Sequence, residues 1–160
     1  MGTFKIDRHD AAIIRELQRD GRATIQEISE RVGLSPSPVA RRLRLLERGG
    51  VVTGYTATID EHAIGLGFSV FVSVKLDKQV DDALATFEAA IARHPEVVDC
   101  WLMTGSRDYL LRVATSGLAE FERFLVGTFT RIPGVASIES SIPLRRVKPN
   151  GGDKAGMVRG

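Results

Sequence analysis

The stretch "LSPSPVARRLRLLERGG", residues 34–50, decides the fold of the first part of the chain. Ser35 is a favoured N-cap residue, and Pro36 follows it at the first helical position, where a missing N–H costs nothing. Pro38 still lies in the first turn, whose amides have no acceptor within the helix. The pattern therefore predicts a helix from Pro36 to Arg48 that its prolines begin rather than break.

This predicted helix has two different faces. At 100° per residue, Val39, Leu43 and Leu46 share one face, which is typical of a helix that packs on a core. The opposite face is polar and basic, so we expect it to point outward. Its members are Ser37, Arg41, Arg44 and Arg48.

Two shorter helices are predicted before this one. Asp7 can cap the first, which carries isoleucine and leucine at helical spacing and ends at Gly21. Thr24 begins the second, with Glu27 three residues later in a capping box, and Gly33 ends it. Three helices in this order, the last of them basic, predict a helix-turn-helix unit.

A linker is expected after the glycine pair at residues 49 and 50. The segment "VVTGYTATI", residues 51–59, is rich in β-branched residues and predicts a strand. Acids and glycines follow it, so we place a domain boundary near Asp60. The predicted domains are residues 1–60 and 61–148, and the glycine-rich residues 149–160 are expected to form a mobile tail.

The second half predicts alternating strands and helices. "FSVFVSVKL", residues 68–76, alternates apolar and polar side chains as a strand does. After it come a helix with Val80 and Phe87 on one face, strands over 97–103 and 109–114, a helix with an apolar face from Leu118 to Phe129, and a strand over 135–144. The order β-α-β-β-α-β predicts a ferredoxin-like domain, and the fold class of the whole chain is α+β.

Composition excludes several classes of protein. Hydrophobic residues at 43% and charged residues at 26% are typical of a globular chain. No apolar run is long enough to span a membrane, which predicts a cytoplasmic protein with no membrane partner. One cysteine and three scattered histidines give neither a disulfide framework nor a metal site. The net charge is +2 over residues 1–60, −4 over 61–144 and +4 over 145–160, so a polyanion would meet the ends of the chain.

Four segments in this order resemble the Lrp/AsnC family of feast/famine transcription regulators, over about residues 4–148. They are "IDRHDAAIIRELQRDGR" (6–22), "ISERVGLSPSPVARRLRLLERGGVVTGYTATID" (28–60), "GSRDYLLRV" (105–113) and "IPGVASIESS" (132–141). The resemblance implies that residues 1–60 are a winged helix-turn-helix for DNA binding, joined to an αβ domain over residues 61–148 for dimerisation and effector binding. Such domains dimerise by sheet-to-sheet packing, assemble further into tetramers or octamers, and commonly bind an amino acid between subunits.

The third helix carries the predicted contacts with double-stranded DNA. A recognition helix presents its N-terminal residues to base edges, while basic side chains and helix-end amides grip phosphate. The sequence does not divide the arginines between these two roles, and a merely solvated basic face is the alternative interpretation. The predicted DNA-binding residues are Ser35, Ser37, Pro38, Arg41, Arg42 and Arg44.

The resemblance places the effector at the turn "TGSRDY", residues 104–109. Its amides could receive the carboxylate of an amino acid, and Asp108 would pair with the ammonium group. By local sequence alone the segment is an ordinary β-turn. Many relatives carry an acid directly after the glycine, whereas Ser106 and Arg107 intervene here. The predicted effector residues are Thr104, Gly105, Arg107, Asp108 and Tyr109, with Ser140 and Ser141 as secondary candidates.

The sequence therefore predicts a sequence-specific transcription regulator that responds to an amino acid or related metabolite. We expect no cofactor, no catalytic residue and at least a homodimer. Two alternatives share the fold. One is an architectural protein that wraps DNA without a ligand, and the other is an enzyme similar to the siroheme decarboxylases. No nucleophile and base pair supports the enzyme.

Overall fold

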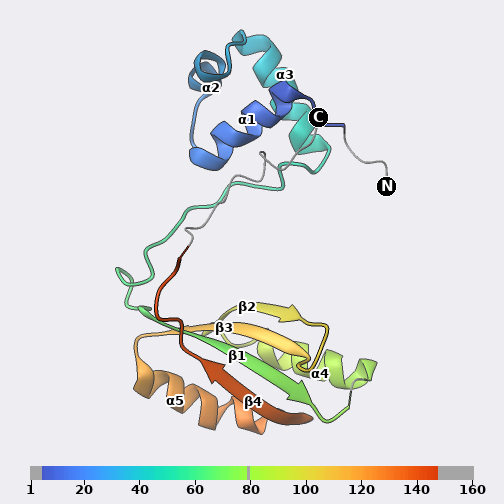
Figure 1. The fold of residues 1–160 in the computed structure, drawn as a ribbon, viewed down its shortest axis with the longest axis vertical. Helices are drawn as coiled ribbons and strands as arrows, with labels where there is room; N and C mark the ends of the chain where they lie inside the picture. Colours follow the sequence, from blue (N-terminus) through green and yellow to red (C-terminus); the bar gives the residue numbers. More distant parts are fainter. Residues whose placement is uncertain (1–4, 79, 148–160) are drawn as a thin grey trace. The chain divides into compact units, whose positions relative to one another are not determined.

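The computed structural model describes residues 5–78 and 80–147, which form two compact units (Figure 1). The first unit runs up to Thr58, and the second spans Ile59–Arg146. The division falls just before Asp60, where the sequence places the domain boundary. The predicted mobile tail, residues 149–160, lies outside the described residues.

The first unit consists of three helices, α1 (Arg8–Arg19), α2 (Ile25–Val32) and α3 (Pro36–Arg48). Reciprocal capping boxes begin the first two helices, Asp7 with Asp10 on α1 and Thr24 with Glu27 on α2. The predicted bounds of α3 are confirmed. Ser35 has the extended backbone of an N-cap, although its side chain makes no capping hydrogen bond. Pro36 and Pro38 have no N–H, so few amides of the first turn could donate to the Ser35 hydroxyl.

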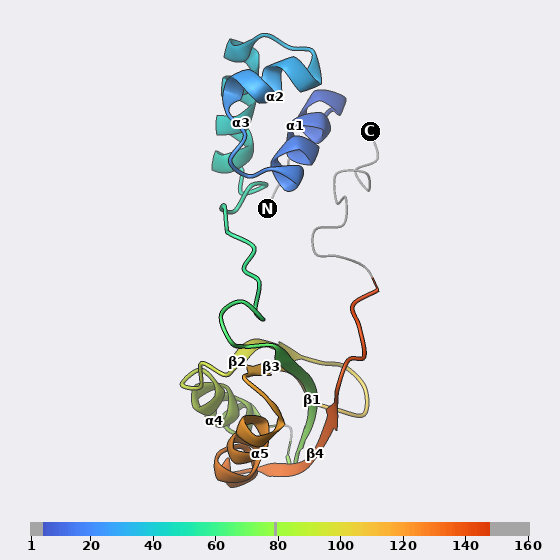
Figure 2. The ribbon, with the colours of Figure 1, turned by 90° about the vertical axis from the view of Figure 1, so that its left-hand side faces the viewer.

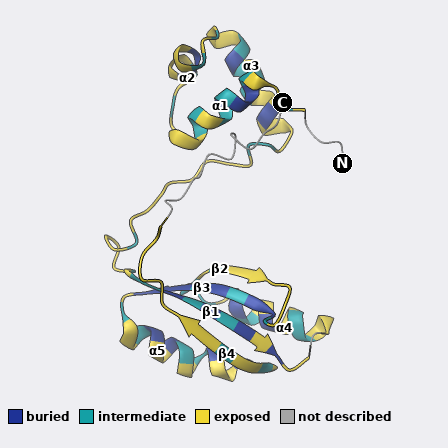
Figure 3. Ribbon diagram, in the orientation of Figure 1, coloured by how far each residue is buried: buried dark blue, intermediate teal, exposed yellow. Residues whose placement is uncertain are grey.

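One fully buried cluster holds the three helices together. Ile13 of α1, Ile28 of α2, and Val39 and Leu46 of α3 have no exposed surface. Figure 3 shows buried stretches, coloured dark blue, on α1 and α3. Gly33 ends α2 with φ +69°, a conformation that glycine adopts without strain, and so turns the chain into α3. The predicted helix-turn-helix is confirmed.

The predicted linker strand over residues 51–59 is wrong. The described residues there form no strand, and most are exposed. A strand needs a neighbouring strand edge for its amides and carbonyls, and the rest of this unit is helical. The segment is instead held by α3: the amides of Val51 and Val52 donate to the Leu46 carbonyl at 2.9 and 3.1 Å, and the Tyr55 hydroxyl donates to Oε1 of Glu47 at 2.8 Å.

The second unit has the predicted β-α-β-β-α-β order. Its sheet is antiparallel with strand order β2-β3-β1-β4. The last strand ends at residue 141 and not at 144, because Pro143 has no amide to continue the ladder, and Phe129 lies in a short 3-10 helix after α5. The elements are β1 (Phe68–Leu76), α4 (Asp81–Ile91), β2 (Val97–Leu102), β3 (Tyr109–Thr115), α5 (Leu118–Gly127), η1 (Phe129–Arg131) and β4 (Val135–Ser141).

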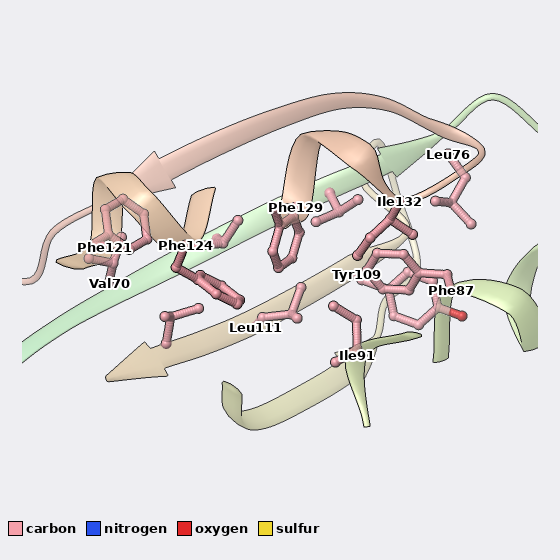
Figure 4. Packing of buried hydrophobic residues seen from close by; sticks show 13 residues of the cluster. Val70, Leu76, Phe87, Ile91, Tyr109, Leu111, Phe121, Phe124, Phe129 and Ile132 are labelled. Atoms are coloured by element: carbon pink, nitrogen blue, oxygen red, sulfur yellow. The ribbon is translucent and has the colours of Figure 1, made fainter. Parts of the chain in front are cut away.

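The helices α4 and α5 cover one face of this sheet (Figure 2). Alternate residues of β1 and β3 meet aromatic side chains from the helices there and form the core (Figure 4). Residues paired across strands share a face, so the registers also define the other side of the sheet, which we call the open face. It carries Ser69, Phe71, Ser73 and Lys75 of β1, Leu110, Arg112 and Ala114 of β3, Asp99 and Trp101 of β2, and Ser137, Glu139 and Ser141 of β4.

Candidate DNA-binding helix and effector turn

The outward face of α3 is polar and accessible. Ser35, Ser37, Arg41 and Arg44 are exposed, and Pro38 is partly buried against the unit. Within the described residues Arg41 and Arg44 form no ion pair with an acid of this chain. Two exposed guanidinium groups on one face of a helix can bind phosphate or guanine edges.

Arg42 differs from its two neighbouring arginines. Its Nη1 lies 2.8 Å from Oδ2 of Asp7 and 2.7 Å from Oδ1 of Asp10, both at the start of α1. The side chain of Arg42 is 22% exposed and that of Asp10 only 10%. The amide of Asp10 and the Arg42 guanidinium lower the pKa of Asp7 from 3.8 to about 2. The Arg42 guanidinium is therefore paired within the helical unit, unlike those of Arg41 and Arg44.

The sequence contains a signal that separates Arg42 from Arg41. At 100° per residue Arg42 lies about 60° from Val39, beside the buried stripe of α3, whereas Arg41 lies on the far side. An arginine that borders the packed face is placed to reach a neighbouring helix. The acids at positions 7 and 10 were available as partners, but their contact depends on how the helices cross.

The effector turn begins as the sequence predicts. Thr104, Gly105 and Ser106 are exposed, and Gly105 has φ +111°, which favours glycine. Arg107 lies over the open face, where its Nη2 is 2.7 Å from Oε2 of Glu139 and its Nη1 donates to Oγ of Ser137 at 2.8 Å. The turn thus brings a cation and an anion together at an exposed loop.

Asp108 and Tyr109 belong to the core instead. Asp108 is 2% exposed, and its carboxylate accepts a hydrogen bond of 2.7 Å from the amide of Leu76. The ring of Tyr109 packs against Phe87, tilted by 33° at a centroid distance of 4.5 Å, and its hydroxyl donates to Oε1 of Glu88 at 2.8 Å. Burial and this hydrogen bond raise the pKa of Tyr109. Both side chains are buried, whereas Thr104, Gly105 and Ser106 are exposed.

The two serines of β4 point to opposite faces of the sheet. Ser140 is paired with Val72, a core residue, so it lies on the helix-covered side. Ser141 is paired with Phe71 and shares the open face with Glu139. Only Ser141 can therefore act together with Arg107. Sequence reasoning missed Glu139 and Ser137, although the alternation of β4 places both on one face with Ser141.

A second ion-pair group lies on the open face. Nη1 of Arg112 is 2.8 Å from Oε1 of Glu61, and its Nε is 2.9 Å from Oδ2 of Asp99. Phe71, Leu110 and Trp101 provide the apolar part of the same face, and Trp101 is 44% exposed. The open face is thus partly apolar and partly charged.

The described residues contain no group of acids, histidines and cysteine that would hold a metal ion. Among the helices of residues 5–78 and 80–147, none has the length and apolar character needed to cross a membrane.

Family models match both units. The model for a winged helix-turn-helix DNA-binding domain matches residues 6–53, and that for the Lrp/AsnC ligand-binding domain matches residues 69–153. The two matches lie in the order that the fold predicts.

Relatives match nearly the whole chain. It is 46% identical to the Bkd operon transcriptional regulator of Pseudomonas aeruginosa, over 89% of this chain and 94% of the relative. It is 38% identical to the leucine-responsive regulatory protein of Salmonella typhimurium, over 89% and 87%. A transcriptional regulator from Neisseria meningitidis, solved in complex with L-Met, is 37% identical with a TM-score of 0.86 and covers 91% of this chain and 94% of its own. These relatives are regulators and not enzymes, and the chain belongs to the Lrp/AsnC family of transcription regulators.

Proposed function

We propose that this regulator recognises specific DNA sites through the outward face of α3 and that an apolar amino acid, bound at the open face, changes that binding. The observation that carries the DNA part is the contrast among the arginines. Arg41 and Arg44 are exposed and make no ion pair within the described chain, whereas Arg42 is held by two acids. We assign DNA contact to Ser35, Ser37, Pro38, Arg41 and Arg44, and we place the protein in the cytoplasm with its DNA.

The effector part rests on the charges around the turn. A zwitterion needs an anion for its ammonium group and donors for its carboxylate. Glu139, with a side chain 62% exposed, can accept the ammonium, and Arg107 with the exposed amides of residues 104–106 can bind the carboxylate. Glu139 thus replaces Asp108, whose carboxylate is buried. The leucine-responsive and L-Met-bound relatives support an apolar amino acid as the effector.

We propose that the open face also forms the homodimer. Its apolar residues Phe71, Leu110 and Trp101 would be covered by the same face of a second copy, in an isologous contact. Further assembly to tetramers or octamers is part of this proposal, because Leu102 of β2 is exposed, is paired with the core residue Tyr109, and would remain outside that contact. Dimerisation would also place two α3 helices on one DNA molecule.

The test is capture of sheared genomic DNA by the full chain at near-physiological salt, with and without the twenty amino acids, followed by sequencing. The proposal predicts enrichment of a few palindromic sites by the wild type and loss of that enrichment in Arg41→Ala. An amino acid should change the set or the strength of the sites. Uniform recovery that no amino acid alters would favour an architectural protein and refute the proposal.

A further inference from the structure

The carboxylates that Arg42 contacts are the same two that begin α1. The Asp7 side chain accepts from the amide of Asp10 at 2.9 Å, and the Asp10 side chain accepts from the amide of Asp7 at 3.1 Å. Nη1 of Arg42 then bonds to the remaining oxygen of each carboxylate, Oδ2 of Asp7 and Oδ1 of Asp10. One guanidinium nitrogen thereby ties the middle of α3 to the first turn of α1.

The hydrophobic cluster between these helices is small. Four of its residues are fully buried, and partly buried residues such as Ile14 and Leu17 of α1 pack against them, so a polar contact between α1 and α3 adds to a small core. Glu16 of α1 forms the corresponding tie to α2, at 3.3 Å from Nη1 of Arg31. With its side chain only 10% exposed, Asp10 is screened less by salt than a surface acid. The Arg42 group is therefore placed to fix α3 against α1.

We propose that Arg42 is a positioning residue that holds α3 at the orientation in which its outward face fits the duplex, and that it does not contact DNA itself. The inference rests on the proposed recognition face of α3. Base contacts require side chains held within about 0.5 Å of their productive geometry, so a small rotation of α3 weakens specific binding.

The two possible roles of Arg42 predict opposite changes in DNA affinity when a partner acid is neutralised. If Arg42 bound phosphate, removing the negative charge of Asp10 would release it and bring DNA closer, so binding would tighten. If Arg42 positions α3, Asp10→Asn weakens specific binding although it makes the unit more positive. The amide oxygen of asparagine can still accept from the Asp7 amide, so the cap of α1 is retained.

The experiment measures binding of the full chain by fluorescence anisotropy at several salt concentrations. The probes are a duplex recovered by the genomic capture and a scrambled duplex of the same composition. We expect Asp10→Asn to weaken binding to the captured duplex roughly three- to tenfold, the size expected for the loss of one hydrogen bond of ordinary net strength. Affinity for the scrambled duplex and the salt dependence should stay at wild-type values. Glu30→Gln, which removes an exposed acid of α2, is the control and should not weaken binding.

Arg42→Met completes the test. It should weaken binding to the captured duplex with an unchanged salt slope, and its effect should not add to that of Asp10→Asn, because both variants break the contact between Arg42 and Asp10. A slope shallower by about 0.9, as for one lost phosphate contact, would overturn the inference. So would tighter binding by Asp10→Asn. If the far-UV circular dichroism of Asp10→Asn shows lost helix, Asp7→Asn takes its place.

Arg41→Ala separates this inference from the proposed function. If Arg41→Ala binds the captured duplex as the wild type does, the recognition face itself is wrong. If Arg41→Ala fails to bind while Asp10→Asn tightens binding, the face stands and only the positioning role of Arg42 is refuted.

Discussion

Replacing Asp108 by alanine tests the assignment of this acid to the core of the second unit. Its carboxylate, 2% exposed, accepts from the Leu76 amide at 2.7 Å, and its own amide donates to the Val74 carbonyl at 2.8 Å. Alanine keeps the backbone bond but leaves the Leu76 amide without this acceptor. A hydrogen bond to a charged group contributes about 1.5 to 3 kcal/mol, so we expect Asp108→Ala to lower the unfolding free energy by about 2 kcal/mol.

The assay is urea unfolding followed by the fluorescence of Trp101. This is the only tryptophan in the sequence and it lies in β2, so the signal reports on the second unit alone. With a typical urea dependence for a domain of this size, a loss of about 2 kcal/mol moves the midpoint down by roughly 1 M. All variants are measured at one protein concentration, because dimerisation would itself shift the midpoint.

Two variants make the result interpretable. Asp108→Asn retains an oxygen that can accept from Leu76 and should lose less stability than the alanine variant. Asp77→Ala removes an exposed acid next to Leu76 and should leave the midpoint unchanged. The reasoning is refuted if Asp108→Ala unfolds with the wild-type midpoint. If Asp108→Ala lost the effector response but kept the wild-type stability, Asp108 would belong to the effector site.

Three further variants test other parts of the structure. Gly33→Ala forces a side chain into the left-handed turn between α2 and α3 and should cost the first unit about 1 kcal/mol, measured by thermal unfolding at 222 nm; an unchanged Tm would contradict the turn. Asp7 has a depressed pKa, so it contributes stability above pH 3.8 that is lost as the pH falls toward about 2. In Asp7→Asn the unfolding free energy should therefore fall less between pH 4 and pH 2 than in the wild type. An equal fall in both proteins would count against the Arg42 contact. Tyr109 has a raised pKa, so its contribution to stability is present below pH 10 and is lost as the pH rises above that value. In Tyr109→Phe the unfolding free energy, measured by Trp101 fluorescence, should therefore fall less above pH 10 than in the wild type.

The helices and strands were predictable because their signals are local. Capping boxes, the prolines of α3 and the alternation of β1 each depend on residues a few positions apart. The linker strand failed for the opposite reason, since a β-branched segment such as residues 51–59 becomes a strand only beside a strand edge. Propensity alone does not supply that neighbour.

The sites were predicted less completely than the fold. Exposure of Arg41 and Arg44 follows from helical periodicity, and the turn at Gly105 follows from its residues. The partners of Arg42 and Arg107 are about 30 positions away in the sequence, and they meet only through helix crossing and strand register. The burial of Asp108 has the same origin, because its acceptor role depends on the end of β1.

The measurement that tests the proposed effector site most directly is the affinity of the full chain for a captured duplex, with and without each apolar amino acid, in the wild type and in Glu139→Gln. Coupling between sites is typically 1 to 3 kcal/mol, so we expect a change of about fivefold or more for the wild type with at least one amino acid. In Glu139→Gln the change should be lost while the ligand-free affinity is kept. Equal affinity with and without every amino acid, or a full response in Glu139→Gln, would contradict the proposed effector site.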